Sequence, residues 1–253
     1  MKTLRVCIVF LFLLSLCPFS VAGETAQDNN IFPDLLTDEF EDESFDDEPQ
    51  LLIRDPLEPV NRFFFEFNDV VYDWVLKPVN YGYSWLLPVE LRISFGNFFY
   101  NLASPVRLLN SFLQGDLKAS GVVLERFLIN STIGVWGLVD IAAIEFDIQP
   151  QRADFGQTLG KWGVGEGIYF CWPLVGPSTA RDTVGLVVDA YTHPIPYFHD
   201  NLTLDVAYYL SNRINTLSLN PTFYDDLRKY SLDPYIAFRQ AYYEYRKAFV
   251  ETP

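Results

Sequence analysis

Residues 55–76, DPLEPVNRFFFEFNDVVYDWVL, carry the clearest structural pattern in this chain. Apolar side chains recur at the i, i+3, i+4 spacing of one helix face, charged side chains fall on the opposite face, and a mixed side lies between them, which indicates an amphipathic α-helix. The apolar face holds Val60, Phe63, Phe64, Phe67, Val71 and Trp74. The charged face holds Arg62, Glu66, Asp69 and Asp73, and the mixed side holds Asn61, Phe65, Asn68 and Tyr72.

This helix admits two interpretations. Asp55 can cap its first turn, and Pro56 and Pro59 lie where an early turn tolerates proline. A helix with three different sides can contact three environments at once. An ordinary core helix with two additional aromatic side chains explains the same pattern, and both interpretations stay open at this point.

Short helical patterns fill most of the remaining chain, separated by prolines and glycines such as Pro78, Pro88, Pro105 and Gly115. We expect helices at 79–87, 89–102, 105–114, 117–131, 180–191, 202–217, 221–230 and 234–250. No convincing hairpin of alternating strands is found. The sequence therefore predicts an all-α single domain of many short to medium amphipathic helices.

Residues 155–177, FGQTLGKWGVGEGIYFCWPLVGP, do not fit that helical pattern. They contain six of the fourteen glycines, and five of these precede a run of apolar and aromatic side chains. This segment is too apolar for an ordinary surface loop and too interrupted for a membrane-spanning helix, which needs about 20 apolar residues. The protein core, a partner or lipid has to cover it.

The first fifty residues are expected to lie outside the folded domain. Residues 1–22 have the positive start, apolar centre and small-residue cleavage site of a secretory signal peptide. Residues 23–50 contain eleven Asp and Glu but no Lys or Arg, which predicts a disordered acidic tether. Residues 51–253 then form the helical domain.

The charge argues against nucleic-acid binding, and the cysteine content argues against a disulfide or a reactive thiol. The tether accounts for most of the net charge of −15, so the domain itself is only mildly acidic. Nucleic-acid binding usually requires a basic face, and we expect no nucleic-acid partner. If the signal peptide is removed, Cys171 remains the single cysteine. A lone thiol in an aromatic run is typical of a buried apolar residue.

Common catalytic and metal-binding patterns are missing from the sequence. The glycines at 163, 165 and 167 lack the spacing and context of a nucleotide-binding loop. The chain has no GxSxG, HExxH or CxxC motif. His193, His199 and Asp200 could in principle bind a metal, but no third strong ligand cluster accompanies them. We therefore expect no enzyme activity, no cofactor and no metal site.

Three blocks of residues, in register over about 200 residues, resemble the MlaA/VacJ family of bacterial outer-membrane proteins. The first block comprises Asp55, Pro56, Leu57 and Glu58 with Asn61, Arg62, Phe67 and Asn68. The second comprises residues 155–160, Gly163, Val164 and Gly165 with Pro173, Gly176, Arg181 and Asp182. The third comprises Ser231, Leu232, Asp233, Pro234 and Tyr235.

The resemblance implies a flat ring of helices with a central amphipathic channel and a Gly-rich hairpin. It implies a place on the periplasmic side of the outer membrane of a Gram-negative bacterium. Such proteins collect misplaced phospholipid from the outer leaflet and pass it to a soluble carrier, MlaC, which delivers it to the MlaFEDB transporter. They also associate with trimeric porins. The resemblance therefore implies a role in maintaining lipid asymmetry.

Combined with the helix pattern, the resemblance suggests two groups of site residues. On the first helix, we expect Asn61, Phe65, Asn68 and Tyr72 to approach the channel while Phe63, Phe64 and Phe67 pack the ring. The apolar run after the glycines could dip into a leaflet or fold back against the channel as a gate, or it could be plain core. The gate candidates are Gly163, Gly165, Gly167, Tyr169, Phe170, Trp172 and Pro173.

One departure from the family pattern concerns its lipid anchor. Cys17 follows a bulky Leu16 and precedes Pro18, whereas a lipidated cysteine follows a small residue, so cleavage near Ala22 is the better expectation. Two other functions remain as alternatives: an envelope scaffold or surface-interaction protein linked to bacterial spread, and an exported hydrolase. The missing catalytic motifs weaken the hydrolase.

Overall fold

The computed structural model describes residues 55–198 and 200–251. The expected signal peptide (1–22), tether (23–50) and Cys17 lie outside these residues. The all-α prediction is confirmed, with one small sheet added. The elements are α3 (Glu58–Val71), a π-helical turn (Tyr72–Leu76), α4 (Lys77–Leu86), α5 (Val89–Leu102), α6 (Ser104–Leu113), α7 (Leu117–Thr132), α8 (Ile141–Phe146), α9 (Phe155–Lys161), β1 (Tyr169–Trp172), β2 (Gly176–Thr179), α10 (Ala180–Thr192), α11 (Ile195–Phe198), α12 (Leu202–Leu219), α13 (Phe223–Tyr230) and α14 (Pro234–Glu251).

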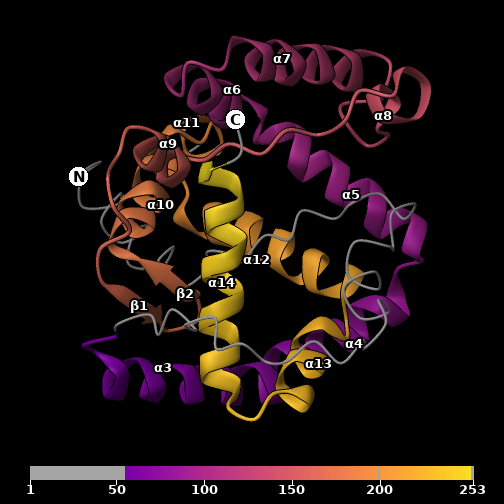
Figure 1. Ribbon diagram of the computed structural model, residues 1–253. Coiled ribbons are helices and arrows are strands. Elements are labelled where there is room, and N and C mark those ends of the chain that lie inside the picture. The colour runs from indigo at the N-terminus through magenta and orange to yellow at the C-terminus, as the bar shows by residue number, and fades with distance from the viewer. Residues whose placement is uncertain (1–54, 199, 252–253) are drawn as a thin grey trace, which may run out of the picture.

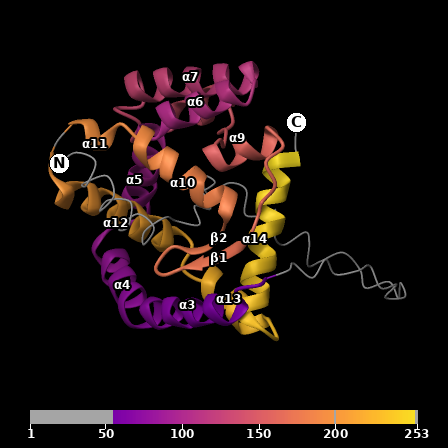
Figure 2. The same ribbon diagram turned by 90° about the vertical axis from the view of Figure 1, so that its left-hand side faces the viewer.

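The sequence suggested that the first helix ends before Pro78. In the structure the helical backbone continues through this residue. A π-helical turn joins α3 directly to α4, and the backbone N–H of Lys77 donates to the carbonyl of Tyr72. Proline has no N–H to donate, and it is tolerated here because Pro78 falls in the first turn of α4. The two helices are therefore joined without a loop, and the chain changes direction between them (Figure 1, Figure 2).

Three helices were missing from the sequence prediction. The helices α8 and α11 have only six and four residues, too few to show a period. The helix α9 begins the glycine-rich segment, where Asp154 caps it by accepting from the Gln157 N–H at 2.8 Å. A Cβ on Gly185 of α10 would come within 2.3 Å of the Gly156 nitrogen, so glycine there permits close packing of α9 on α10.

The helices pack around a small hairpin, which lies toward one side of the molecule in Figure 1, next to α3, α10 and α14. Figure 1 shows α3, α4 and α5 following one another around the outside, α6 and α7 packed together beyond α5, and α9 and α10 on the remaining side. Figure 2 shows the long helices α14 and α12 on opposite faces of the molecule, with β1 and β2 between them. Segments far apart in the chain therefore meet at the hairpin.

The alternating pattern of the sequence did not reveal this hairpin, although the family resemblance implied one. Strand β1 pairs antiparallel with β2, Tyr169 opposite Thr179 and Trp172 opposite Gly176. Burial alternates along β1, but four residues are too few for this period to stand out in sequence. The glycines at 163, 165 and 167 precede the hairpin instead of forming it.

The inner face of β1 packs into an aromatic core. Tyr169 and Cys171 are buried together with Tyr235 and Tyr242 of α14. This confirms the prediction that Cys171 is buried. Burial raises the pKa of the Cys171 thiol to about 12, so the thiol stays protonated at neutral pH.

The apolar face of α3 is divided between the interior and the surface. Phe63 is 64% exposed, whereas Phe64 is partly buried and packs against the aromatic core. The mixed side faces inward, because its asparagines bind the hairpin. Exposed apolar side chains continue along α4 and α5, including Trp85, Leu86 and Leu91. Within the described residues, no helix has both the length and the apolar character needed to cross a membrane.

Candidate functional site

Two asparagines of α3 hold the hairpin through its backbone. The Asn61 amide donates to the Tyr169 carbonyl at 3.1 Å, and its oxygen accepts from the Cys171 N–H at 2.9 Å. The Asn68 amide donates to the Trp172 carbonyl at 2.8 Å, and its oxygen accepts from the Leu174 N–H. Asn61 thus binds the inner part of β1, and Asn68 binds the turn.

The spacing of these asparagines explains why one helix can serve one strand. Seven residues of α-helix advance about 10.5 Å, and three residues of strand advance about 10 Å. The amides therefore reach successive backbone groups along the free edge of β1, where a third strand would otherwise pair. The hydrogen bonds that β1 cannot make with β2 are supplied by α3.

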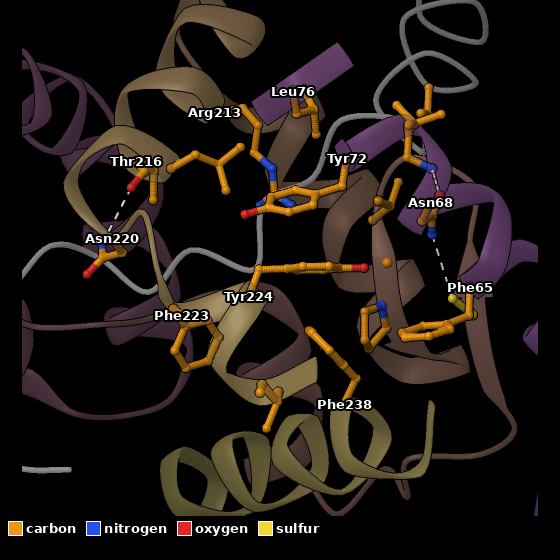
Figure 3. A pocket seen from close by; sticks show the side chains of 18 of the residues that line it. Phe65, Asn68, Tyr72, Leu76, Arg213, Thr216, Asn220, Phe223, Tyr224 and Phe238 are labelled. Atoms are coloured by element: carbon orange, nitrogen blue, oxygen red, sulfur yellow. Dashed lines mark hydrogen bonds between the residues drawn. The ribbon is translucent and has the colours of Figure 1, made fainter. Parts of the chain in front are cut away.

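A pocket of about 140 Å³ lies beside the turn of the hairpin. Its walls come from α3, the π-helical turn, the hairpin, α12, α13 and α14, as Figure 3 shows for the labelled side chains. The lining is mostly apolar and aromatic, with a few polar groups. The apolar lining includes Phe65, Val71, Leu76, Val175 and Phe238; the polar lining is Asn68, Tyr72, Arg213, Thr216, Asn220 and Tyr224.

The two tyrosines of the pocket are neutral hydrogen-bonding groups. Their rings stack with centroids 4.1 Å apart. Burial, reinforced by the charge of Asp225, raises the pKa of Tyr72 to about 12. Burial and the neighbouring Asp69 also raise the pKa of Tyr224, whose hydroxyl donates to the Asp69 carboxylate at 3.2 Å. Both hydroxyls therefore keep their protons at neutral pH.

The structure places the four channel candidates in two groups. Phe65, Asn68 and Tyr72 line the pocket. Asn61 is not among the lining residues; it is 2% exposed and lies under the hairpin, where it also donates to Asp55 at 2.9 Å. Asn61 therefore has a structural contact, whereas Asn68 contacts both the hairpin and the pocket.

The gate candidates separate in the same way. Tyr169 lies in the core, and Phe170 stacks on Trp172 with ring centroids 5.4 Å apart. Pro173 begins the turn, and the residues after it, 174–177, line the pocket. The glycines at 163, 165 and 167 do not. The part of the segment that borders the pocket is thus the turn together with Cys171 of β1 and the first two residues of β2.

The first and last family blocks meet at the start of α3. Arg62 donates both terminal nitrogens to Asp233, at 3.2 and 2.8 Å, and its guanidinium lies 4.5 Å from the centre of the Tyr235 ring. The Tyr235 hydroxyl in turn donates to Asp55. Pro234 is the first residue of α14, and Pro56 precedes the first turn of α3. These motif residues join the two ends of the domain.

The middle family block forms a second buried network. Asp182 accepts hydrogen bonds from Arg181 at 3.0 Å, from Arg246 and from the Tyr242 hydroxyl. Burial opposes ionisation of this carboxyl, but the Arg246 charge and these hydrogen bonds outweigh it and lower the pKa of Asp182. Arg246 also binds Asp154 at 2.6 Å. Arg181 and Asp182 thus tie α9, α10 and α14 together.

Sequence reasoning missed the pocket residues of α12 and α13. Arg213, Thr216 and Asn220 lie three and four residues apart, the spacing of one helix face. That spacing was the available signal, but no motif distinguished it from an ordinary solvent-facing stripe. Tyr224 gave no signal, because its place depends on the fold of α13 against α3.

The histidines do not form a metal site in the described residues. His193 is buried, its ring nitrogen lies 3.2 Å from the Tyr208 hydroxyl, and burial lowers its pKa to about 4. His199 lies outside the described residues. Within the part of the chain that the structure describes, no group of three His, Cys, Asp or Glu side chains could hold a metal ion.

Comparisons with known proteins find relatives that match most of this chain. A Rickettsia typhi protein described as uncharacterized is 33% identical over 204 residues, 80% of each chain. The Haemophilus influenzae protein called intermembrane phospholipid transport system lipoprotein MlaA is 34% identical over 195 residues, which is 76% of this chain and 77% of that protein. The Escherichia coli protein of the same name is 34% identical over 194 residues, 75% and 76% of the two chains.

A solved structure described as the structural basis for maintenance of bacterial outer membrane lipid asymmetry matches the fold. It superposes with a TM-score of 0.69 and 31% identity, covering 78% of this chain and all of that one. The family model for MlaA lipoprotein matches residues 53–249. This chain therefore belongs to the MlaA lipoprotein family.

Proposed function

We propose that this protein carries phospholipid out of the outer membrane of a Gram-negative bacterium and so helps to maintain lipid asymmetry. The pocket carries the proposal, because a phospholipid needs apolar walls for its acyl chains and polar groups for its head. Named relatives in the family are intermembrane phospholipid transport proteins, which supports the same function. Carriage of lipid requires no bond to break, and we infer a non-catalytic role.

The exposed apolar faces support a position within one leaflet. Trp74 of the π-helical turn and Trp85 of α4 are 79% and 81% exposed, and aromatic side chains of this kind suit the boundary between lipid and water. Helices lying in the membrane plane can bury such faces without spanning the bilayer. We place the protein in the inner leaflet of the outer membrane, facing the periplasm.

The remaining partners follow from that position. Phospholipid leaving the pocket has to cross an aqueous periplasm, and a soluble carrier of the MlaC type meets that need before delivery to the MlaFEDB transporter. Association with a trimeric porin would bring the protein close to the outer leaflet. In this scheme the pocket forms part of the central amphipathic channel that the family resemblance implies.

The turn of the hairpin is our candidate for the moving part. Residues 174–177 line the pocket, and the turn is held to α3 by the two hydrogen bonds of Asn68. The base of β1 is fixed more firmly, because Tyr169 and Cys171 lie in the core and Asn61 binds between them. A small displacement of the turn would open the pocket while the base stays in place.

A lipid-transfer assay between vesicles tests the function. Phe65→Asp places a charge in the apolar wall and should slow transfer at least about tenfold, whereas Phe65→Leu should retain most of it. Because Phe65 also packs on Tyr235, circular dichroism must show unchanged helicity. Ala241→Phe offers a second variant, which fills the pocket without adding charge.

Unchanged transfer in both pocket variants would reject the pocket as the lipid path. Mass spectrometry of lipid extracted from protein purified out of membranes gives a separate measurement. Bound phospholipid supports the transport role. A lipid-free protein bound tightly to another envelope protein would instead support the scaffold alternative.

A further inference from the structure

Most polar side chains that line the pocket are already engaged within the protein. Asn68 binds the backbone of the hairpin with both ends of its amide. The Thr216 hydroxyl donates to the Asn212 carbonyl at 2.9 Å, and the Asn220 amide donates to the Thr216 carbonyl at 3.4 Å. Figure 3 shows this contact between Thr216 and Asn220 beside the pocket. These groups therefore have less to offer a polar ligand than their residue types suggest.

The remaining polar lining residues follow the same rule, with one exception. The Tyr224 hydroxyl donates to Asp69 at 3.2 Å, and Arg213 has an interaction of its own. The exception is the Tyr72 hydroxyl, which makes no hydrogen bond to the described residues. A charged head group that leaves water needs several open donors, and one neutral hydroxyl does not supply them. The pocket therefore favours an apolar ligand group over a charged one.

The apolar lining comes from several elements. It includes Phe65 of α3, Leu76 of the π-helical turn, Phe223 of α13 and Phe238 of α14. Figure 3 shows these four side chains on different sides of the pocket. An apolar group that enters therefore meets apolar side chains around it, and burial of its surface stabilises the bound state.

The size of the pocket limits how much of a lipid it can hold. Its volume is about 140 Å³. In another protein, an apolar cavity of about 150 Å³ binds one benzene molecule. By this comparison the pocket has room for about six carbons of an acyl chain. The two acyl chains of a phospholipid cannot both enter a space of this size.

We propose that the pocket binds a segment of about six carbons from a single acyl chain, and that it recognises the chain and not the head group. This proposal rests on the proposed lipid function of the pocket and names the part of the lipid that is held there. The head group and the second chain stay outside the lining. A lipid with one acyl chain should therefore bind as well as a phospholipid with two.

A series of lysophosphatidylcholines with acyl chains of increasing length tests the proposal. Binding to the full chain is measured in cholate, because the rigid steroid ring of this detergent is too wide for the pocket. Affinity should rise about fourfold with each added methylene until the chain reaches about six carbons, and then level off. Lysophosphatidylglycerols of the same chain lengths should give the same curve, although their head group is anionic.

Two variants of the pocket wall should move this plateau in opposite directions. Ala241→Leu fills part of the pocket and should move the plateau to a chain shorter by about three carbons. Leu227→Ala empties a similar volume and should move it to a chain longer by about three carbons. Ala248→Leu, at an exposed position of α14, is the matched control and should leave the plateau in place. Thermal unfolding checks that each variant remains folded.

Three results would reject the acyl-chain site. The affinity of the native protein could continue to rise well beyond the plateau, the curves of the two head groups could differ, or neither pocket variant could move the plateau. Failure of the proposed function has a different signature. A native protein that shows the plateau but moves no phospholipid between vesicles would reject the transport role and leave the site intact.

Discussion

At the level of single residues, Asn61 of α3 shows that a polar side chain can be more deeply buried than an apolar neighbour. Asn61 is nearly fully buried, whereas Phe63, two positions later, is 64% exposed. A buried amide is stable only when its donors and acceptors are paired, and Asn61 achieves this with the backbone of β1. The inward side of α3 is therefore set by hydrogen bonding to the hairpin.

Asp189 provides a test of electrostatics inside the fold. Burial, reinforced by the neighbouring charge of Asp154, raises the pKa of Asp189 to about 7, although Phe155 N–H, Asn110 and Arg246 oppose this rise. An unfolded aspartate has a pKa of about 3.9. Between these values the folded state binds a proton that the unfolded state has released, so stability should fall as pH rises from about 4 to 7 and level off above that.

Denaturant unfolding across this range measures the effect. Asp189→Asn removes the titrating group and should flatten the decline in the free energy of unfolding. Asp226→Asn, at an exposed position of α13, is the control and should leave the decline in place. A slope that is unchanged in Asp189→Asn would assign the pH dependence to another group.

At the level of elements, sequence patterns predicted long helices well and short or contact-dependent elements poorly. The segments expected at 89–102, 117–131 and 234–250 match α5, α7 and α14 to within one residue. These helices are long enough to repeat their period several times. The helix α9 and the hairpin were missed because Gly156 permits close packing on α10 and β1 obtains its second set of hydrogen bonds from α3.

The candidate site was predictable only in part, for the same reason. Phe65, Asn68 and Tyr72 could be identified because they share a face of one strongly periodic helix. Arg213 and Tyr224 lie more than 130 residues further along the chain and reach the pocket through tertiary packing. The family motif residues Arg62 and Asp233 likewise meet only in the folded chain.

A reversible crosslink tests whether the hairpin moves. The Leu174 N–H donates to the Asn68 oxygen, so Asn68→Cys with Leu174→Cys, in a Cys171→Ser background, should bring two thiols close enough to form a disulfide between α3 and the turn. The oxidised variant should transfer lipid slowly, and reduction should restore transfer in the same sample. Native protein treated with the same oxidant is the control. If the oxidised and reduced variants transfer lipid at the same rate, transfer does not require the hairpin to move.

At the level of the whole molecule, the distribution of exposed apolar side chains predicts how the protein meets a membrane. Trp74→Glu should weaken binding to phospholipid vesicles about tenfold or more, because it removes a large apolar surface and adds a charge that lipid disfavours. Trp74→Phe retains the apolar surface and should bind nearly as well. Vesicle flotation measures both. If Trp74→Glu binds vesicles as strongly as the native protein, the surface around Trp74 does not face the lipid.

The ion pair between Arg62 and Asp233 also has a consequence for assembly. These residues are separated by 171 positions, and the Asn61 contact with Tyr169 spans 108. Contacts of such sequence separation form late, because a long loop must close before they are gained. The N-terminal helix therefore completes these contacts only after nearly the whole domain is available for folding. Until then its apolar face and the free edge of β1 are exposed, which leaves this stage of folding open to proteolysis and aggregation.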